Sequence, residues 1–161
     1  MSKIDLILQE SEKAFIQERI RADKLWGASE KLIGAVAVIM GFHLIEIDRL
    51  TLTGNWRQVA QGWLAICAIV ALMLALFLAL LSMQVQKYYS YPRGTTLIDD
   101  LKDDSITDQA AMIKIARMYL KAHDNNARIN DKRARLVFYS LIMLVTGLLF
   151  AVFSYFLGIV L

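Results

Sequence analysis

The stretch WLAICAIVALMLALFLALLSMQV, residues 63–85, decides the fold class, because none of its residues is charged. A helix needs about 20 apolar residues to cross the roughly 30 Å hydrocarbon core of a bilayer. A second uncharged stretch, VFYSLIMLVTGLLFAVFSYFLGIVL at residues 137–161, also meets this requirement. The sequence therefore predicts an all-α membrane protein.

Composition points the same way. The 161 residues are 57% hydrophobic, whereas soluble domains average about 45–50%. A disulfide scaffold is excluded because Cys67 is the only cysteine. Collagen-like and disordered chains are excluded by the single proline, the eight glycines and the high hydrophobicity.

A third span is expected at residues 32–48, although this stretch is shorter and contains ionisable side chains. On length alone it could be the core helix of a soluble domain. With three spans, however, 16 of the 18 basic residues lie in residues 1–31 or 86–136, and only Arg49 and Arg57 lie in the short loop, 49–62. The positive-inside rule then places the basic side in the cytoplasm. The predicted topology is three transmembrane helices, N-in and C-out, with cytosolic extensions of the first and third helices forming a helical bundle.

Residues 1–31 are predicted to form a cytosolic amphipathic helix that runs on into the first span, since no glycine or proline precedes Gly27. Ser11 and Glu18 interrupt its apolar stripe. The stripe consists of Ile4, Leu8, Phe15, Ala22 and Leu25.

Residues 86–105 form a connector, and residues 106–136 a second cytosolic helix. A capping box at Ser105 and Asp108 favours a helix start there. From Ile106 no helix breaker occurs before the third span, and Asn125–Asn126 is the one weak point, at which a local break is allowed.

Small residues recur at helical spacing in the first two spans, which is typical of close helix packing in lipid. The sequence does not separate packing within the chain from packing between subunits. The candidate packing residues are Gly34, Gly41, Ala68, Ala71, Ala75 and Ala79.

Ionisable side chains at the end of the first span are candidates for a pore. His43 and Glu46 are three residues apart, and Asp48 follows. Such residues in several subunits would make an electronegative constriction that favours cations. Alternatively, Glu46 reaches the outer interface and pairs with Arg49. Three helices cannot enclose a wide pore, so conduction would require a homo-oligomer.

The helix over residues 106–136 carries a predicted contact seam with steps of three and four residues. Polar side chains at two seam positions are of the kind that fixes register or oligomer state. The seam consists of Ile113, Ala116, Leu120, His123, Ala127, Asn130, Ala134 and Val137.

A basic row runs beside this seam, and it could neutralise phosphates. Alternatively, its membrane-proximal part, with Arg133, satisfies the positive-inside rule or touches anionic lipid. The distal part could also meet an acidic face of a neighbour. The candidate phosphate-binding residues are Arg93, Lys114, Arg117, Lys121, Arg128, Lys132 and Arg135.

No catalytic signal is visible. The sequence has no metal-ligand cluster, glycine-rich phosphate loop or nucleophile motif. We therefore expect no enzyme activity, no cofactor and no metal site.

Three motifs resemble small transmembrane effectors of bacterial anti-phage systems that are paired with a nucleotidyltransferase or cyclase. They are the entry to the first span, RADKLWGASEKLIGAVAVIM; the aromatic–proline corner, QKYYSYPRG; and the entry to the last span, NNARINDKRARLVFYSLIMLVTGLL. The last includes an N-x3-N-x-K pattern at Asn126, Asn130 and Lys132. The effectors that the chain resembles are the Hailong, Pycsar and CBASS transmembrane effectors.

The resemblance implies a homo-oligomeric channel in the bacterial inner membrane, with a tetramer as one arrangement, that depolarises the infected cell. It implies gating by a short single-stranded DNA oligomer or a cyclic nucleotide made by a cognate nucleotidyltransferase. The length of the basic row favours the DNA oligomer. The alternatives are a non-conducting membrane scaffold that recruits a partner through its cytosolic coiled coil, and a phage holin.

Overall fold

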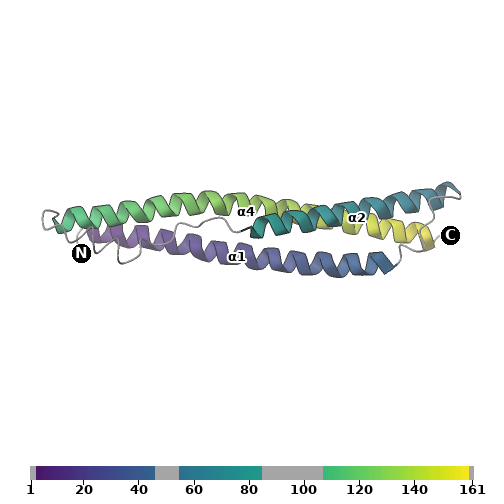
Figure 1. The fold of residues 1–161 in the computed structure, drawn as a ribbon, viewed down its shortest axis with the longest axis horizontal. Coiled ribbons are helices and arrows are strands. Elements are labelled where there is room, and N and C mark those ends of the chain that lie inside the picture. The colour runs from purple at the N-terminus through teal and green to yellow at the C-terminus, as the bar shows by residue number, and fades with distance from the viewer. Residues whose placement is uncertain (1–2, 46–54, 85–106, 160–161) are drawn as a thin grey trace. The chain divides into compact units, whose positions relative to one another are not determined.

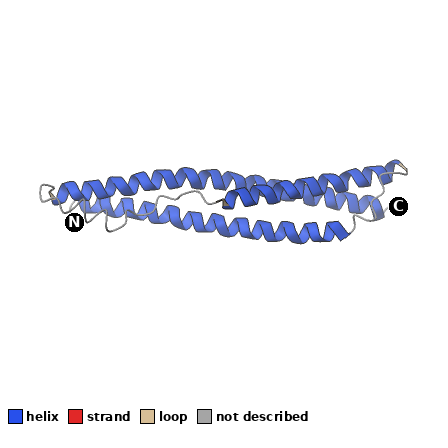
Figure 2. Ribbon diagram, in the orientation of Figure 1, coloured by secondary structure: helices blue, strands red, loops and turns tan. Residues whose placement is uncertain are grey.

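A computed structural model describes residues 3–45, 55–84 and 107–159, and these parts of the chain are helical throughout apart from residues at the helix ends (Figures 1 and 2). The helices are α1 (Lys3–Ile45), α2 (Trp56–Met83) and α4 (Asp108–Ile159). All three are long and apolar enough to cross a membrane. The prediction of an all-α chain with three candidate spans is confirmed.

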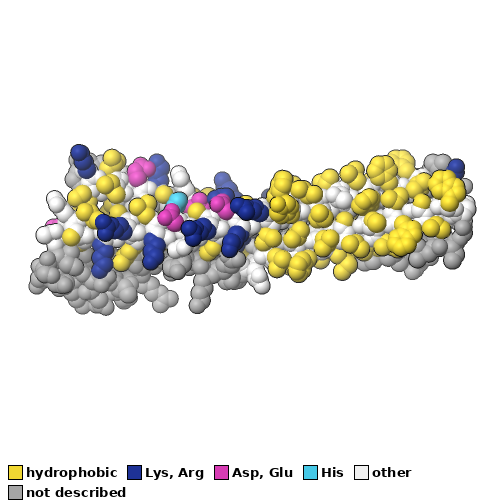
Figure 3. All heavy atoms as spheres, turned by 90° about the horizontal axis from the view of Figure 1, so that it is seen from above, with side chains coloured by type: hydrophobic (Ala, Val, Ile, Leu, Met, Phe, Trp, Pro, Cys, Tyr) yellow, Lys and Arg dark blue, Asp and Glu magenta, His cyan; other side chains and the backbone are white. Residues whose placement is uncertain are grey.

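The contacts divide the chain into two compact units. Unit 1 comprises residues 1–24 and 85–132, and unit 2 comprises residues 25–84 and 133–161. Charged side chains gather over unit 1 and hydrophobic side chains over unit 2 (Figure 3). The division follows the chemistry of the chain, because the described residues of α2 and of α4 beyond Arg135 carry a single charge, at Arg57.

Two helices run through both a charged segment and a predicted span. In α1, the amphipathic segment and the first span form one continuous helix, as expected. In α4, the segments predicted at 106–136 and 137–161 also form one helix. The local break allowed at Asn125–Asn126 does not occur. Asn126 is buried, so packing holds in the helix a residue whose intrinsic preference is for turns.

Helices α2 and α4 both begin at a different residue from the one predicted, and each begins after a capping side chain. α2 begins at Trp56 and takes in residues 56–62, which were predicted as loop. The Asn55 side chain accepts from the backbone N–H of Gln58 at 3.1 Å, and the Gln58 side chain accepts from the Asn55 N–H at 3.2 Å. α4 begins at Asp108, with the Thr107 hydroxyl accepting from Ala110 N at 3.4 Å. The predicted cap, Ser105, lies outside the described residues.

Unit 2 brings together residues 25–45 of α1, the whole of α2 and residues 133–159 of α4. α2 runs antiparallel to α4, since Ser140 of α4 donates to Ala75 O and Ser154, further along, donates to Gln61 O. The hydrophobic core of unit 2 consists of Val36, Leu72, Ala75 and Leu144.

Small residues allow the helices of unit 2 to approach closely. At Gly147 of α4, an added Cβ would lie 2.9 Å from Leu72 Cγ of α2. The hydroxyls of Ser29 on α1 and Ser82 on α2 lie 2.6 Å apart. Such contacts suit lipid, in which burying a large apolar side chain gains little over contact with acyl chains.

Unit 1 pairs residues 3–24 of α1 with residues 107–132 of α4. The two helices are parallel, because Phe15 contacts Tyr119 edge-on at 5.8 Å and Arg21, further along, contacts Asp131. Ala22 of α1 is buried in this unit. The buried residues of α4 are Ala116, Tyr119, Ala122, Asn126 and Asn130.

Candidate functional site

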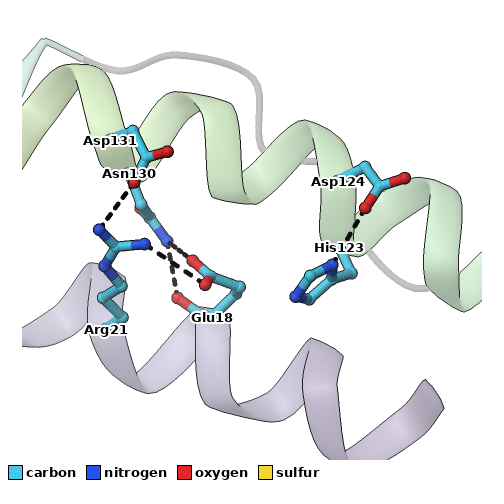
Figure 4. Close-up of polar contacts among 6 residues, drawn as sticks. All are labelled: Glu18, Arg21, His123, Asp124, Asn130 and Asp131. Carbon is cyan, nitrogen blue, oxygen red and sulfur yellow. Dashed lines mark hydrogen bonds and ion pairs between the residues drawn. The ribbon is translucent and has the colours of Figure 1, made fainter.

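A polar cluster links the two helices of unit 1. The Asn130 side chain is fully buried. Its Nδ2 donates to the Glu18 backbone oxygen at 2.9 Å and to Glu18 Oε2 at 2.7 Å (Figure 4). One amide group therefore satisfies both a main-chain carbonyl and a carboxylate of the facing helix. Because these bonds form at one level of the two helices only, they fix the register of the pair.

Arg21 extends this cluster toward solvent. Its Nη2 donates to Asp131 Oδ1 at 2.7 Å, and its Nη1 lies 3.5 Å from Glu18 Oε1 (Figure 4). The hydrogen bond to Asp131, helped by the charges of both carboxylates, raises the pKa of Arg21 further above its ordinary value. The guanidinium therefore stays charged at any pH at which the protein is folded.

The sequence indicated Asn130 as a polar seam residue but did not indicate its partner. Glu18 was treated as an interruption of the apolar stripe of α1. Ser11, the other interruption, is buried and donates to Leu8 O at 2.8 Å. Both positions therefore belong to the contact face. The sequence offered one clue to this pairing. A carboxylate on a helix–helix contact face, such as that of Glu18, needs a hydrogen-bond donor at the same level of the facing helix.

The contact face of α4 is rotated relative to the predicted seam. Ala116 and Asn130 are buried and His123 is half-buried, but Ile113 and Leu120 are exposed. Tyr119 and Ala122 are buried in their place. The physical reason is the Phe15–Tyr119 ring contact, which turns α4 by about one residue. His123 lies beside Asp124, with Nδ1 3.2 Å from Oδ1 (Figure 4).

The predicted basic row is exposed along its described length, and none of its members belongs to the buried face of α4. Five of its cations lie in unit 1 and Arg135 lies in unit 2. Exposed lysine and arginine side chains can reach phosphate oxygens as charge-assisted donors. The five cations in unit 1 are Lys114, Arg117, Lys121, Arg128 and Lys132.

Arg133 differs from its basic neighbours, because it is buried in unit 2. Its Nη2 donates to Gln84 O at 3.2 Å. Gln84 is the C-cap of α2, so the cation lies at the negative end of that helix dipole. The sequence interpretation explained Arg133 by the positive-inside rule or by contact with anionic lipid, and its burial against α2 leaves little of the side chain exposed for such a contact.

The predicted pore residues are described only in part. His43 is half-buried, and within the described residues its buried Nε2 has no hydrogen-bond partner. Glu46, Asp48 and the alternative partner Arg49 lie outside the described residues. The predicted ligand residue Arg93 also lies outside them.

The candidate packing residues fall into two groups. Ala68, Ala71, Ala75 and Ala79 are all buried in unit 2. Gly34 and Gly41 of α1 are exposed, and a Cβ added at either would meet nothing within 4 Å. The alanines of α2 therefore serve packing within the chain, whereas the glycine face of α1 is not packed against described residues.

Metal-binding side chains do not gather in groups of three or more within residues 3–45, 55–84 and 107–159. Comparison with known proteins found no matching family model, no matching curated protein and no matching solved structure.

Proposed function

We propose that this chain is an anti-phage membrane effector: an oligomeric ion channel of the bacterial inner membrane, gated by a nucleotide-derived anion on the basic row. The topology is N-in and C-out, so that unit 1 lies in the cytoplasm. The proposal adopts what the resemblance to the nucleotidyltransferase-linked effectors implies.

The observation that carries the proposal is the continuity of α4. The exposed cations, from Lys114 to Lys132, stand on the same unbroken helix as the apolar stretch that follows Arg135. A helix is stiff, so an anion that shifts or rotates its charged part also displaces its apolar part. Ligand binding could thereby be coupled to a pore without a separate sensor domain.

The ligand is a short single-stranded DNA oligomer or a cyclic nucleotide. The extended row suits the oligomer better, because successive backbone phosphates can meet successive cations. The conduction path uses His43, Glu46 and Asp48 of several subunits as a cation-favouring constriction.

The primary test is the membrane potential of bacteria that express this chain alone, followed by dye fluorescence. Prompt depolarisation is expected if the anion holds the channel shut. If the anion opens it, depolarisation requires co-expression of a nucleotidyltransferase or cyclase. Purified protein that gives no conductance in planar bilayers, with or without nucleotide probes, would contradict the channel and favour the membrane scaffold.

The ligand site is tested with a fluorescent 12-nucleotide single-stranded DNA and a cyclic dinucleotide as probes. Lys121→Glu with Arg128→Glu should weaken DNA binding at least tenfold and reduce its salt dependence by roughly 0.7 in log–log slope for each lost phosphate contact. The matched control, Arg19→Glu with Lys24→Glu, makes the same charge change on exposed positions of α1. Equal loss in both variants would indicate a general charge effect and no site on α4.

Selectivity is tested with Glu46→Gln and Asp48→Asn together. The reversal potential in a cation gradient should move toward zero, because the constriction loses its negative charge. An unchanged reversal potential would exclude these residues as the selectivity determinant.

A further inference from the structure

Unit 1 leaves apolar side chains exposed on both of its helices. Leu6, Ile16 and Ile20 of α1 are 47 to 51% exposed, and Ile113 and Leu120 of α4 are 43 and 45% exposed. Lipid cannot cover them, since ten of the 22 residues 3–24 are charged and such a segment stays out of hydrocarbon. Apolar side chains aligned along a helix in water are typical of a protein–protein contact.

These side chains lie on two stripes with the spacing of helix–helix contacts, alternating three and four residues. We define the outer α1 stripe as Leu6, Gln9, Lys13, Ile16, Ile20 and Asp23. We define the outer α4 stripe as Ile113, Arg117, Leu120, Asp124 and Ala127. All these positions are exposed except Ala127, which is half-buried.

The charges on the stripes select which stripe pairs with which. If the outer α1 stripe met its own copy in parallel, Lys13 would oppose Lys13 and Asp23 would oppose Asp23. The outer α4 stripe paired with itself would oppose Arg117 to Arg117 and Asp124 to Asp124. Like charges held together in this way disfavour a pairing.

Pairing the α1 stripe with the α4 stripe of another copy gives opposite charges instead. Lys13 comes two residues before Phe15, which contacts Tyr119, and eight residues before Arg21, which contacts Asp131. Together the two contacts place its level on α4 within residues 117–123, next to Asp124. Copies inserted in one orientation are related by rotation about the membrane normal, which preserves these levels. Lys13 of one copy then meets Asp124 of the next.

The second charge on the α1 stripe follows the same rule. Asp23 comes two residues after Arg21, which contacts Asp131, and so stands level with Lys132 of α4. Lys132 is exposed. Lys132 lies beside the outer α4 stripe, so the Lys13–Asp124 pair is the charge pair within the proposed contact.

We propose that the outer α1 stripe docks on the outer α4 stripe of a second copy of this chain. The contact is head-to-tail, because each copy offers one stripe to each neighbour, and head-to-tail contacts close into rings when the rotation allows. This inference rests on the oligomeric part of the proposed function and is independent of conduction, and it shares Arg117 with the proposed ligand row.

Cysteine cross-linking in native membranes tests the pairing. In a Cys67→Ala background, Leu6→Cys and Ile113→Cys are introduced together, since the Phe15–Tyr119 and Arg21–Asp131 contacts place Leu6 level with Ile113. Oxidation should give a ladder of covalent multimers on non-reducing gels, because each chain bonds to two neighbours. Each single-cysteine variant should remain monomeric.

Two outcomes would overturn the pairing. Covalent dimers from Leu6→Cys alone would show that α1 meets α1. A ladder that fails to form, while the protein keeps its multimeric size in native membranes, would place the contact on other faces. A monomeric size would overturn both this inference and the oligomer of the proposed function.

A charge swap tests the residue pair within that contact. Lys13→Glu and Asp124→Lys should each lower the ladder yield about fivefold, and the double variant should restore it. Arg19→Glu makes the same charge change on an exposed position of α1 that belongs to neither stripe, and should leave the yield unchanged. Failure of the double variant to recover would refute the Lys13–Asp124 pair.

The two proposals fail separately. A ladder in cells that keep their membrane potential with every nucleotide probe would retain this contact and reject the channel. Depolarisation without a ladder would reject this contact and leave the channel standing.

Discussion

Two polar side chains of α4, Asn130 in unit 1 and Ser140 in unit 2, have no exposed surface, yet they are satisfied in different ways. Asn130 donates twice to Glu18, and one of the acceptors is a carboxylate oxygen. Ser140 donates once, to the main-chain oxygen of Ala75 at 2.7 Å. The hydrogen bonds of Asn130 require a carboxylate at the facing position. The hydrogen bond of Ser140 requires only a backbone oxygen, which every residue of a facing helix offers.

The difference follows from the surroundings of each unit. In unit 1, Glu18 keeps a charged neighbour in Arg21, and the cluster reaches water at Asp131, so a carboxylate is tolerated. In hydrocarbon the same carboxylate would be costly. The helices of unit 2 contact one another through hydroxyls and small side chains, which permit close approach, and its buried cation, Arg133, lies at the C-cap of α2. Register is therefore set by side-chain identity in unit 1 and by shape in unit 2.

The largest effect is expected from Asn130→Leu in unit 1. The leucine removes the two N–H donors that Glu18 Oε2 and the Glu18 carbonyl receive from α4 and leaves Oε2 buried without a donor, which should cost about 3 kcal/mol. Amides of residues 107–132 should then exchange with solvent about a hundredfold faster in nanodiscs. Asn125→Leu, at the half-buried neighbouring position, should change exchange little.

A double variant sharpens this test. Glu18→Leu combined with Asn130→Leu removes the stranded carboxylate and should recover much of the loss, since an apolar pair has no unsatisfied charge. If the double variant is no more stable than Asn130→Leu alone, the cost comes from packing and the amide does not set the register.

An intermediate effect is expected from Gly147→Ala in unit 2. The added Cβ would lie 2.9 Å from Leu72 Cγ and 3.3 Å from Ala68 O. Leu72 is fully buried, so the overpacking should cost about 2 kcal/mol, measured by unfolding in mixed micelles. Gly34→Ala adds the same methyl where nothing lies within 4 Å and should cost nothing. Equal losses of stability in Gly147→Ala and Gly34→Ala would mean that the flexibility of glycine in the helix sets the stability of unit 2, and that close packing against Leu72 does not.

Much of this architecture could be predicted from the sequence, because burial in lipid imposes strong demands on composition. Uncharged stretches and the absence of helix breakers were enough to predict three long helices, including the continuity of α1. The start of α2 was placed too late, because a span was delimited by its charges. The capping box of Asn55 and Gln58 that starts this helix lies outside the apolar stretch.

The polar cluster was less predictable, because a single chain pattern does not align two helices. Steps of three and four residues fit neighbouring registers of α4 almost equally well, and the Phe15–Tyr119 contact selects one of them. Glu18 and Asn130 are 112 residues apart, so their pairing depends on the relative height of α1 and α4. That height follows from packing, and the sequence of either helix alone does not contain it.

The smallest effect is expected from Arg21→Gln, which removes the charge at the edge of the polar cluster. The side chains of Arg21 and Asp131 are 42 and 57% exposed, and exposed ion pairs contribute about 0.5 kcal/mol. The loss in unit 1 stability should therefore be small, and it should fade in about 0.5 M salt, where screening shortens the range of the charges. The loss from Asn130→Leu should persist in salt, since its bonds are buried. Hydrogen exchange of both variants at two salt concentrations makes this comparison, with Arg19→Gln as the control for the loss of an exposed charge on α1 outside the cluster. A larger loss for Arg21→Gln than for Asn130→Leu would mean that the ion pair, and not the buried amide, holds α1 and α4 in register.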